Sequence, residues 1–369
     1  MINDDYLQDD SLNFWLKNPP IYDISKSYEE NLLQGPFLRE NFLSKRIFPS
    51  EDLWIDFLGH KIASPIGIPA GPLLDADWVI AASRLGFDVL TYKTIRSRFT
   101  PAHKLPNMLF VDKDSLVALP KGKRPKNILD LAVTNSFGVP SQDIEFIKKD
   151  IKKALEGIKK GQLLIVSVMG TSPSNAHEPS LEEDFAQTAL LAVEAGAPII
   201  ELNFSCPNLS CSLGETYTDA NFIAKVISNV KSYIKDVPII AKLGKFDDDA
   251  TLRKVVCAVA EAGGAGICGL NTLKIELKDE NGEPALGKER LKAGICGVPL
   301  RQEALEFGKK VTLIKQQENL DLKLLLTGGA VIPEHLHDFL NVSADIAMTA
   351  AGMMWNPFLA LQFHGSVHV

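Results

Sequence analysis

Short apolar segments alternate with amphipathic segments from about residue 60 to the end of the chain, and this alternation restricts the fold more than any other feature. Segments with helical spacing separate the apolar ones, at residues 77–85, 182–195, 219–234, 248–262, 302–317 and 334–340. The eight apolar segments lie near residues 65–70, 88–93, 163–169, 198–203, 238–243, 265–270, 323–327 and 344–349. Eight strands that alternate with helices predict a TIM (β/α)8 barrel, with a doubly wound open sheet as the alternative.

Two long connections interrupt this alternation. Residues 94–162 follow the second expected strand, and residues 273–296 follow the sixth. Long insertions after barrel strands usually cover the active site, so we expect both to lie over it. Residues 1–59 have a mixed, proline-broken pattern, which predicts an N-terminal extension packed on a barrel domain of residues 60–369.

Composition and charge exclude several classes of partner. The chain has 369 residues, of which 46% are hydrophobic and 23% charged, and a net charge of −7 gives no indication of nucleic-acid or anionic-membrane binding. No basic start with an apolar core and no stretch long enough to span a bilayer is present, so we expect no membrane anchor. Five scattered cysteines without a CxxC pair predict reduced thiols in the cytoplasm and no metal site.

The sequence Asn203-Phe204-Ser205-Cys206-Pro207-Asn208 follows the expected fourth strand directly. It therefore falls at the C-terminal end of a barrel strand, where active sites form. Two carboxamides, which combine acceptor and donor atoms, suit a planar ligand with C=O and N–H groups. The thiol between them can remove a proton if the site lowers its pKa. The alternative is a structural cysteine beside a turn.

Other polar and small residues end the remaining strands. A lysine with apolar neighbours is costly unless it meets an anion or an electron-rich ring, and glycine-backed phosphate sites recur on the last loops of barrels. Together these features predict a flavin mononucleotide site. The residues are Ala70, Gly71, Lys93, Thr94, Lys242, Leu270, Asn271, Thr272, Gly328 and Gly329, with Asn135, Phe137, Gly138 and Val139 in the first insertion.

These residues resemble the dihydroorotate dehydrogenase family over about residues 60–360. The most specific match is residues 203–208 to the family motif Asn-x-Ser-Cys/Ser-Pro-Asn. Cysteine at the fourth place is the mark of class 1, whereas the membrane-associated class 2 has serine. The resemblance therefore implies a class 1-like, flavin-dependent enzyme of pyrimidine biosynthesis.

The resemblance also implies a role for each residue. Cys206 would remove a proton from C5 of dihydroorotate while hydride passes from C6 to flavin N5. The implied substrate-binding residues are Lys93, Asn135, Phe137, Gly138, Val139, Asn203, Asn208, Asn271 and Thr272. The implied cofactor-binding residues are Ala70, Gly71, Lys93, Thr94, Asn203, Lys242, Leu270, Gly297, Gly328, Gly329, Thr349 and Ala350.

Three departures from the family pattern leave other readings open. The strand-eight sequence 348–351 differs, the stretch from Lys93 to Asn135 is long, and the N-terminal extension has the length of a class 2 segment. One alternative is a flavin oxidoreductase of the same fold that acts on another dihydropyrimidine or cyclic amide. A second is a barrel that binds a ligand without redox chemistry. A homodimer and an electron-transfer partner subunit remain open, as does the final acceptor, which fumarate, NAD through a partner, or a quinone would each supply.

Overall fold

Eight parallel strands close into a barrel in the computed structural model, which describes residues 21–37, 46–205 and 216–365. The order around the barrel is β12-β13-β3-β4-β6-β7-β8-β9, and β12 pairs in parallel with both β13 and β9. This pairing closes the sheet, so the barrel prediction is confirmed and the open-sheet alternative is wrong. The barrel strands are β3 (Ile66–Ile68), β4 (Val89–Ile95), β6 (Leu163–Val168), β7 (Ile200–Asn203), β8 (Ile239–Lys242), β9 (Gly266–Gly269), β12 (Lys323–Thr327) and β13 (Ile346–Met348).

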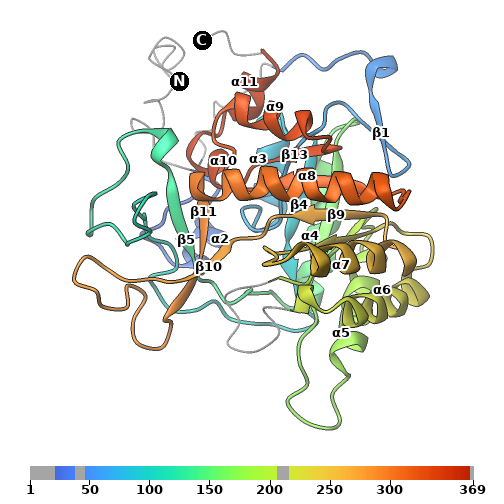
Figure 1. The fold of residues 1–369 in the computed structure, drawn as a ribbon, viewed down its shortest axis with the longest axis horizontal. Coiled ribbons are helices and arrows are strands. Elements are labelled where there is room, and N and C mark those ends of the chain that lie inside the picture. Colours follow the sequence, from blue (N-terminus) through green and yellow to red (C-terminus); the bar gives the residue numbers. More distant parts are fainter. Residues whose placement is uncertain (1–20, 38–45, 206–215, 366–369) are drawn as a thin grey trace.

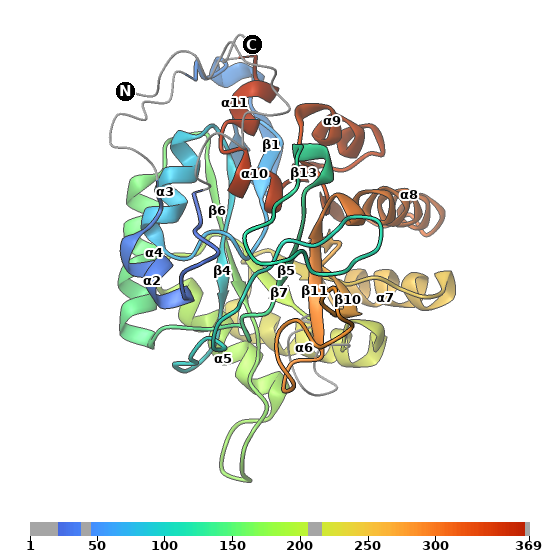
Figure 2. The same ribbon diagram turned by 90° about the vertical axis from the view of Figure 1, so that its left-hand side faces the viewer.

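Helices cover the outside of the barrel, with α3 and α4 on one side and α7, α8 and α9 on the other (Figure 1; Figure 2). None of the helices in the described ranges is both long enough and apolar enough to cross a membrane. The helices are α3 (Ala76–Arg84), α4 (Ile144–Gly157), α5 (Leu181–Glu194), α6 (Ala220–Ile234), α7 (Asp249–Glu261), α8 (Arg301–Gln317), α9 (Pro333–Asn341), α10 (Ala351–Trp355) and α11 (Leu359–Phe363).

Side-chain caps fix where most of these helices begin. Asp75, Asp143, Ser180, Asp219 and Asp248 each accept hydrogen bonds from backbone N–H groups in the first turn of α3, α4, α5, α6 and α7. These N–H groups have no partner within the helix, so a short oxygen-bearing side chain at the boundary stabilises the start. For α3, α5, α6 and α7, the starts predicted from helical spacing lie within one residue of the observed ones.

The first insertion is shorter than the sequence predicted. Helix α4 lies inside residues 94–162 and packs against α3 and α5, so it is a barrel helix and not part of the loop. Its buried residues Ile147, Ile151 and Ala154 follow helical spacing, but charged residues dominate the rest of the helix and obscured the pattern. The insertion that remains is residues 96–143.

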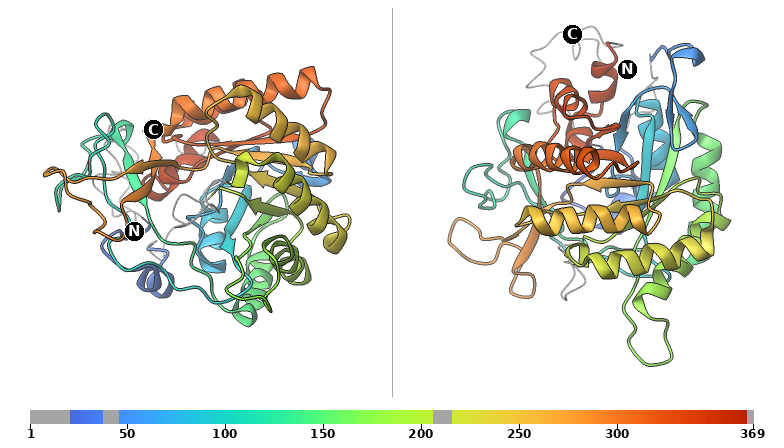
Figure 3. Two further views of the ribbon diagram at one scale, coloured as in Figure 1. Left: turned by 60° about the horizontal axis from the view of Figure 1, so that its bottom comes forward. Right: turned by 45° about the vertical axis from the view of Figure 1, so that its right-hand side comes forward.

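The two insertions meet in a second sheet beside the barrel (Figure 1; Figure 3). Its order is β10-β11-β5, with β10 at Leu273–Glu276, β11 at Lys292–Gly297 and β5 at Ala132–Asn135. Both pairings are antiparallel, and Cys296 of β11 lies opposite Val133 of β5. Segments about 160 residues apart in the chain are therefore held together by backbone hydrogen bonds.

The N-terminal residues contribute to both ends of the barrel. Ser27 caps helix α2 (Tyr28–Gln34) in a capping box, and Tyr22 and Tyr28 are buried in the main core. The hairpin of β1 (Ile55–Phe57) and β2 (His60–Ile62) buries Phe57 and Ile62 among inward-facing residues of the barrel strands. The expected boundary between residues 59 and 60 thus falls in the turn of this hairpin.

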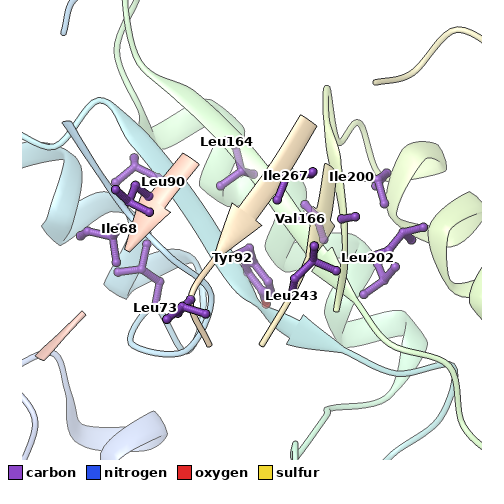
Figure 4. Close-up of a cluster of buried hydrophobic side chains, with 14 of the residues drawn as sticks. Ile68, Leu73, Leu90, Tyr92, Leu164, Val166, Ile200, Leu202, Leu243 and Ile267 are labelled. Atoms are coloured by element: carbon purple, nitrogen blue, oxygen red, sulfur yellow. The ribbon is translucent and has the colours of Figure 1, made fainter. Parts of the chain in front are cut away.

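Alternation along the strands divides the core into two parts. Residues such as Leu90, Tyr92, Leu164 and Val166 face the helices, and Figure 4 displays this layer. Their neighbours along the strands, such as Val89, face the barrel interior with a separate apolar cluster. Successive side chains along a strand point to opposite faces. Alternate positions along each strand therefore decide which polar side chains enter the barrel and which face the helices.

A buried ion pair joins the N-terminal region to the barrel. The Arg46 guanidinium contacts the Asp88 carboxylate, which also accepts a hydrogen bond from Ser64 Oγ at 2.6 Å. Both side chains of the pair are almost fully buried. We expect Asp88→Ala to lower the free energy of unfolding by about 3–5 kcal/mol, because it leaves a buried guanidinium without its counter-charge.

Urea denaturation of the two proteins measures this difference. Asp114→Ala is the control, since Asp114 is an exposed carboxylate that pairs with its neighbour Lys113 on the surface. Equal midpoints for the Asp88 and Asp114 variants would contradict the assigned role of the buried pair.

Candidate active site

One pocket opens at the C-terminal ends of the barrel strands and is walled by the second sheet and the N-terminal region. It contains about 1210 Å³ of space between the atoms, open solvent at its mouth included. Sixteen of the predicted site residues line it. They are Ala70, Gly71, Lys93, Thr94, Asn135, Phe137, Val139, Asn203, Lys242, Leu270, Asn271, Thr272, Gly297, Gly328, Gly329 and Ala350.

The remaining predicted residues do not line the pocket or are not described. Gly138 packs against His103, since a Cβ on Gly138 would lie 2.5 Å from His103 Nε2. Thr349 lies behind the residues that line the pocket, and its hydroxyl donates a hydrogen bond to the Ala330 carbonyl at 2.6 Å. Cys206 and Asn208 fall outside the described residues.

Several lining residues were absent from the sequence prediction. Tyr22 and Tyr28 come from the N-terminal region, and Val133 and Cys296 come from the paired insertions. Cys296 Sγ accepts a hydrogen bond from Asn135 Nδ2 at 3.2 Å, and burial raises the pKa of this thiol to about 11. No local pattern marks Tyr22, Tyr28 or Val133, because contacts distant in sequence bring them to the site. Cys296 carried one signal, as the neighbour of the predicted Gly297.

An irregularity in β4 turns two successive side chains toward the pocket. Tyr92 pairs with Val166 and Ile95 with Val168, so β4 has one more residue than β6 over this stretch. A regular strand would send Lys93 and Thr94 to opposite faces, whereas the extra residue lets both line the pocket.

The carboxamides form a connected network. Asn203 Nδ2 donates to Thr94 Oγ1 at 3.1 Å, while Asn203 Oδ1 accepts from the Ser205 N–H at 3.2 Å. Asn271 Nδ2 lies 3.4 Å from Asn203 Oδ1, and Asn271 Oδ1 accepts from the Thr272 N–H. The Thr272 hydroxyl is buried without a hydrogen-bond partner among the described residues. Hydrogen bonds from neighbouring groups thus orient the amides of Asn203 and Asn271, and the Thr272 hydroxyl beside them is available to a ligand.

Cationic side chains surround the backbone of residues 136–140. Lys93 Nζ donates to the Pro140 carbonyl at 3.2 Å, and Arg96 Nε donates to the Val139 carbonyl at 3.2 Å. From the second insertion, Arg290 Nη1 donates to the Ser136 carbonyl at 3.3 Å. Val139 has a φ of 54°, a strained conformation for a β-branched residue that these contacts help to hold.

Glycines and a helix N-terminus form the opposite part of the pocket. Gly328 and Gly329 have φ of 132° and 79°, and their backbone N–H groups donate to no described residue. A Cβ on Gly329 would lie 2.7 Å from the backbone nitrogen of Arg301, the first residue of α8. Free N–H groups beside the N-terminus of a 17-residue helix make a site for an anion such as phosphate.

Lys242 supplies a cation between these two parts. Its side chain is buried and lines the pocket, and it donates no hydrogen bond to any residue in the described ranges. Glu201 Oε1 lies 4.0 Å from this ammonium group and offsets part of its charge, while its three hydrogen-bond donors stay available to a ligand.

A sequence model of the family described as dihydroorotate dehydrogenase matches residues 52–346. The chain belongs to the dihydroorotate dehydrogenase family. A Dictyostelium discoideum protein named dihydroorotate dehydrogenase is 41% identical over 368 residues, covering 95% of this chain and 98% of its own length. The Escherichia coli K12 NAD-dependent dihydropyrimidine dehydrogenase subunit PreA is 26% identical over 83% of this chain and 69% of its own. The crystal structure of the Eimeria tenella enzyme with ferulenol has a TM-score of 0.70 at 15% identity, over 88% of this chain and 86% of its own.

The pocket of this dihydroorotate dehydrogenase family member fits a flavin, the cofactor type on which the family depends. The unused ammonium of Lys242 suits the electron-rich edge of an isoalloxazine ring. The small side chain of Ala70 and the bare Cα of Gly71 allow a flat ring to approach the backbone.

Two buried acids meet beside the pocket, one at the end of the loop after β3 and one on α4. Asp75 caps α3, and Asp150 of α4 accepts hydrogen bonds from the Tyr92 hydroxyl and the Ala76 N–H, each at 2.7 Å. Burial raises the pKa of Asp75 to about 6, with a further increase from the neighbouring charge of Asp150. Tyr28, which lines the pocket, lies within the field of both acids.

This pKa predicts a loss of stability as pH rises from about 4 to about 6. Across that interval the folded protein holds a proton that the unfolded chain, with an ordinary aspartate pKa of about 4, has released. The side chain in Asp75→Asn stays neutral and still caps the helix. The free energy of unfolding of this variant should therefore fall by about 1–3 kcal/mol less than that of the parent protein over this pH interval. Denaturant unfolding at pH 4.5 and pH 7 measures it.

Asp143→Asn is the matched control, because Asp143 caps α4 from an exposed position. It should keep the pH dependence of the parent protein. If both asparagine variants show the same change between the two pH values, Asp75 is not the group responsible.

Proposed function

We propose that this chain oxidises dihydroorotate to orotate, with flavin mononucleotide as the hydride acceptor and Cys206 as the base. The observation that carries the proposal is one pocket lined by a carboxamide network, Lys93, Lys242 and the Gly328-Gly329 turn after β12. A planar amide-rich substrate fits the first part, and a flavin phosphate fits the second. The Dictyostelium relative, similar over nearly the whole chain, supports the same activity.

The substrate-side residues have distinct roles in this proposal. Asn135, Asn203 and Asn271 hydrogen-bond the C=O and N–H groups of the ring, together with Asn208 and the hydroxyl of Thr272. The backbone at residues 137–139 receives the substrate, and Lys93 binds its carboxylate. Cys206 takes the proton from C5 as the hydride leaves C6.

Cofactor-side residues hold the flavin and exclude water. When bound, flavin mononucleotide supplies the acceptor for the hydride. Gly328 and Gly329 donate backbone N–H groups to the phosphate, and Lys242 faces the flavin ring. The rest of the proposed set is Ala70, Gly71, Lys93, Thr94, Asn203, Leu270, Gly297, Thr349 and Ala350, with Thr349 acting through the Ala330 carbonyl.

A second candidate function is oxidation or reduction of an uncharged dihydropyrimidine, which the likeness to the PreA subunit favours. The cations around residues 136–140 weigh against it, because Lys93, Arg96 and Arg290 create a positive field that favours a carboxylate-bearing substrate. In this proposal the final electron acceptor is fumarate, a partner subunit or a quinone. The proposed enzyme acts in the cytoplasm, as a monomer or a homodimer.

Anaerobic mixing with dihydroorotate tests the proposal. The purified protein should be yellow from non-covalent flavin mononucleotide, and dihydroorotate should bleach its absorbance while dihydrouracil should not. Bleaching by dihydrouracil alone would favour the second candidate. A folded protein that remains colourless after expression with riboflavin would contradict the flavin site itself.

Cys206→Ala should slow flavin reduction by dihydroorotate about 10²–10⁴-fold, because a general base typically contributes that much. Substrate binding should change little, since the carboxamides remain. Cys206→Ser should retain part of the activity with its pH profile moved to higher pH, because an alcohol is a weaker acid than a thiol. Stopped-flow reduction without oxygen measures all three proteins.

Cys211→Ala is the control for a second thiol five residues along the same segment. It should reduce flavin at nearly the parent rate. Similar rates for the two alanine variants would remove Cys206 from the base role.

A further inference from the structure

A buried ion pair lies inside the barrel, one residue step below the pocket. Glu201 and Asn203 on β7 point to the same face of the strand, and Lys242 on β8 lies opposite Asn203 in the register. Asn203 and Lys242 line the pocket, whereas Glu201 is fully buried beneath them. Lys242 Nζ lies 4.0 Å from Glu201 Oε1.

Few groups in the described part of the chain stabilise the charge of Glu201. Neither of its carboxylate oxygens accepts a hydrogen bond from a described N–H or O–H group. The thiol of Cys268 on β9 is nearby, and burial together with the charge of Glu201 raises the pKa of that thiol. A thiol is a weak donor, so the ammonium of Lys242 is the main group that offsets this carboxylate.

Such a pair contributes little to stability, because taking both charges out of water costs about as much as their attraction returns. Its effect is felt instead by whatever group meets Lys242 from the pocket side. An ammonium held against a carboxylate presents less positive potential to a ligand than one that stands alone. The negative charge of Glu201 therefore reduces the positive potential with which Lys242 acts on a bound ring.

We propose that Glu201 is a positioning residue that holds the Lys242 ammonium at the floor of the pocket and sets the reduction potential of the flavin there. The inference rests on the proposed flavin site. Reduced flavin carries negative charge near N1, and a cation beside it favours the reduced form. Glu201 offsets part of that cation and keeps the potential lower than Lys242 alone would make it.

The test is the midpoint potential of the bound flavin, measured by reduction with xanthine and xanthine oxidase against a reference dye. Glu201→Gln keeps the shape and removes the charge, so the potential should rise. We expect at least a tenfold higher ratio of reduced to oxidised flavin at a fixed ambient potential, which is about 30 mV for a two-electron couple. Lys242→Met should shift the ratio in the opposite direction.

Two further variants separate an electrostatic role from a structural one. Glu201→Asp keeps the charge and should keep the ratio within about threefold of the parent, an expectation based on charge balance. Cys268→Ala changes the packing against Glu201 without changing charge and should also leave the potential in place. A structural role would instead shift the potential in these two variants as much as in Glu201→Gln.

A Glu201→Gln variant that binds flavin with an unchanged or lowered potential would overturn the proposal. If that variant does not fold, the Glu201→Gln/Lys242→Met double variant, which leaves no charge of the pair buried, gives the second measurement. Its potential should lie between those of Lys242→Met and the parent, and a value outside that interval would overturn the proposal. The reductant in this measurement is not dihydroorotate, so the potential can be measured even if the substrate assignment is wrong. A parent protein without flavin would refute the proposed flavin site and this inference together.

Discussion

Closure of the eight parallel strands is the constraint on which the rest of this structure depends. Because β12 pairs with both β13 and β9, the strands have no free edge, and all their C-terminal ends meet around one pocket. The hydrogen-bond register then fixes which side chains share a level, as it does for Asn203 and Lys242. Strand parity fixes which of them enter the barrel. A site assembled from five or more distant segments thus needs no separate mechanism to bring its parts together.

Closure of the barrel also makes it costly to bury polar groups inside it, and these groups are stabilised in different ways at different depths. At the pocket level the carboxamide of Asn203 is hydrogen-bonded on both sides, so its orientation is set before any ligand arrives. Two residues lower on β7, the main group that offsets the charge of Glu201 in the described part of the chain is the Lys242 ammonium at 4.0 Å. At the base of the barrel the interior is an apolar cluster closed by Phe57 and Ile62 of the hairpin. Polarity therefore increases toward the rim, where the chemistry is proposed.

Local sequence signals predicted the parts of this arrangement that local physics determines. Apolar runs located all eight barrel strands, and the helical spacing of apolar residues located α6 and α7 to within one residue at their starts. Sixteen predicted site residues share one pocket because each lies at or near a strand end. Helix α4 was missed because its narrow apolar stripe lay within a long stretch without other periodicity. The pairing of β5 with β11 and the entry of Tyr22 into the pocket could not be read locally, since both depend on contacts between distant segments.

Those non-local segments build the side of the pocket that the barrel itself cannot supply. The C-terminal end of a strand contributes only a few side chains to the pocket. Residues 136–140, which face these side chains, belong to the first insertion and not to a barrel strand. This segment is kept in place by three cations from two parts of the chain, Lys93 and Arg96 at the end of β4 and Arg290 before β11. Each donates to a backbone carbonyl, so the strained turn at Val139 is fixed by groups that also carry positive charge. Rigidity and attraction for an anion are thereby provided by the same side chains, and a substitution that loosens the segment also weakens the field that selects its ligand.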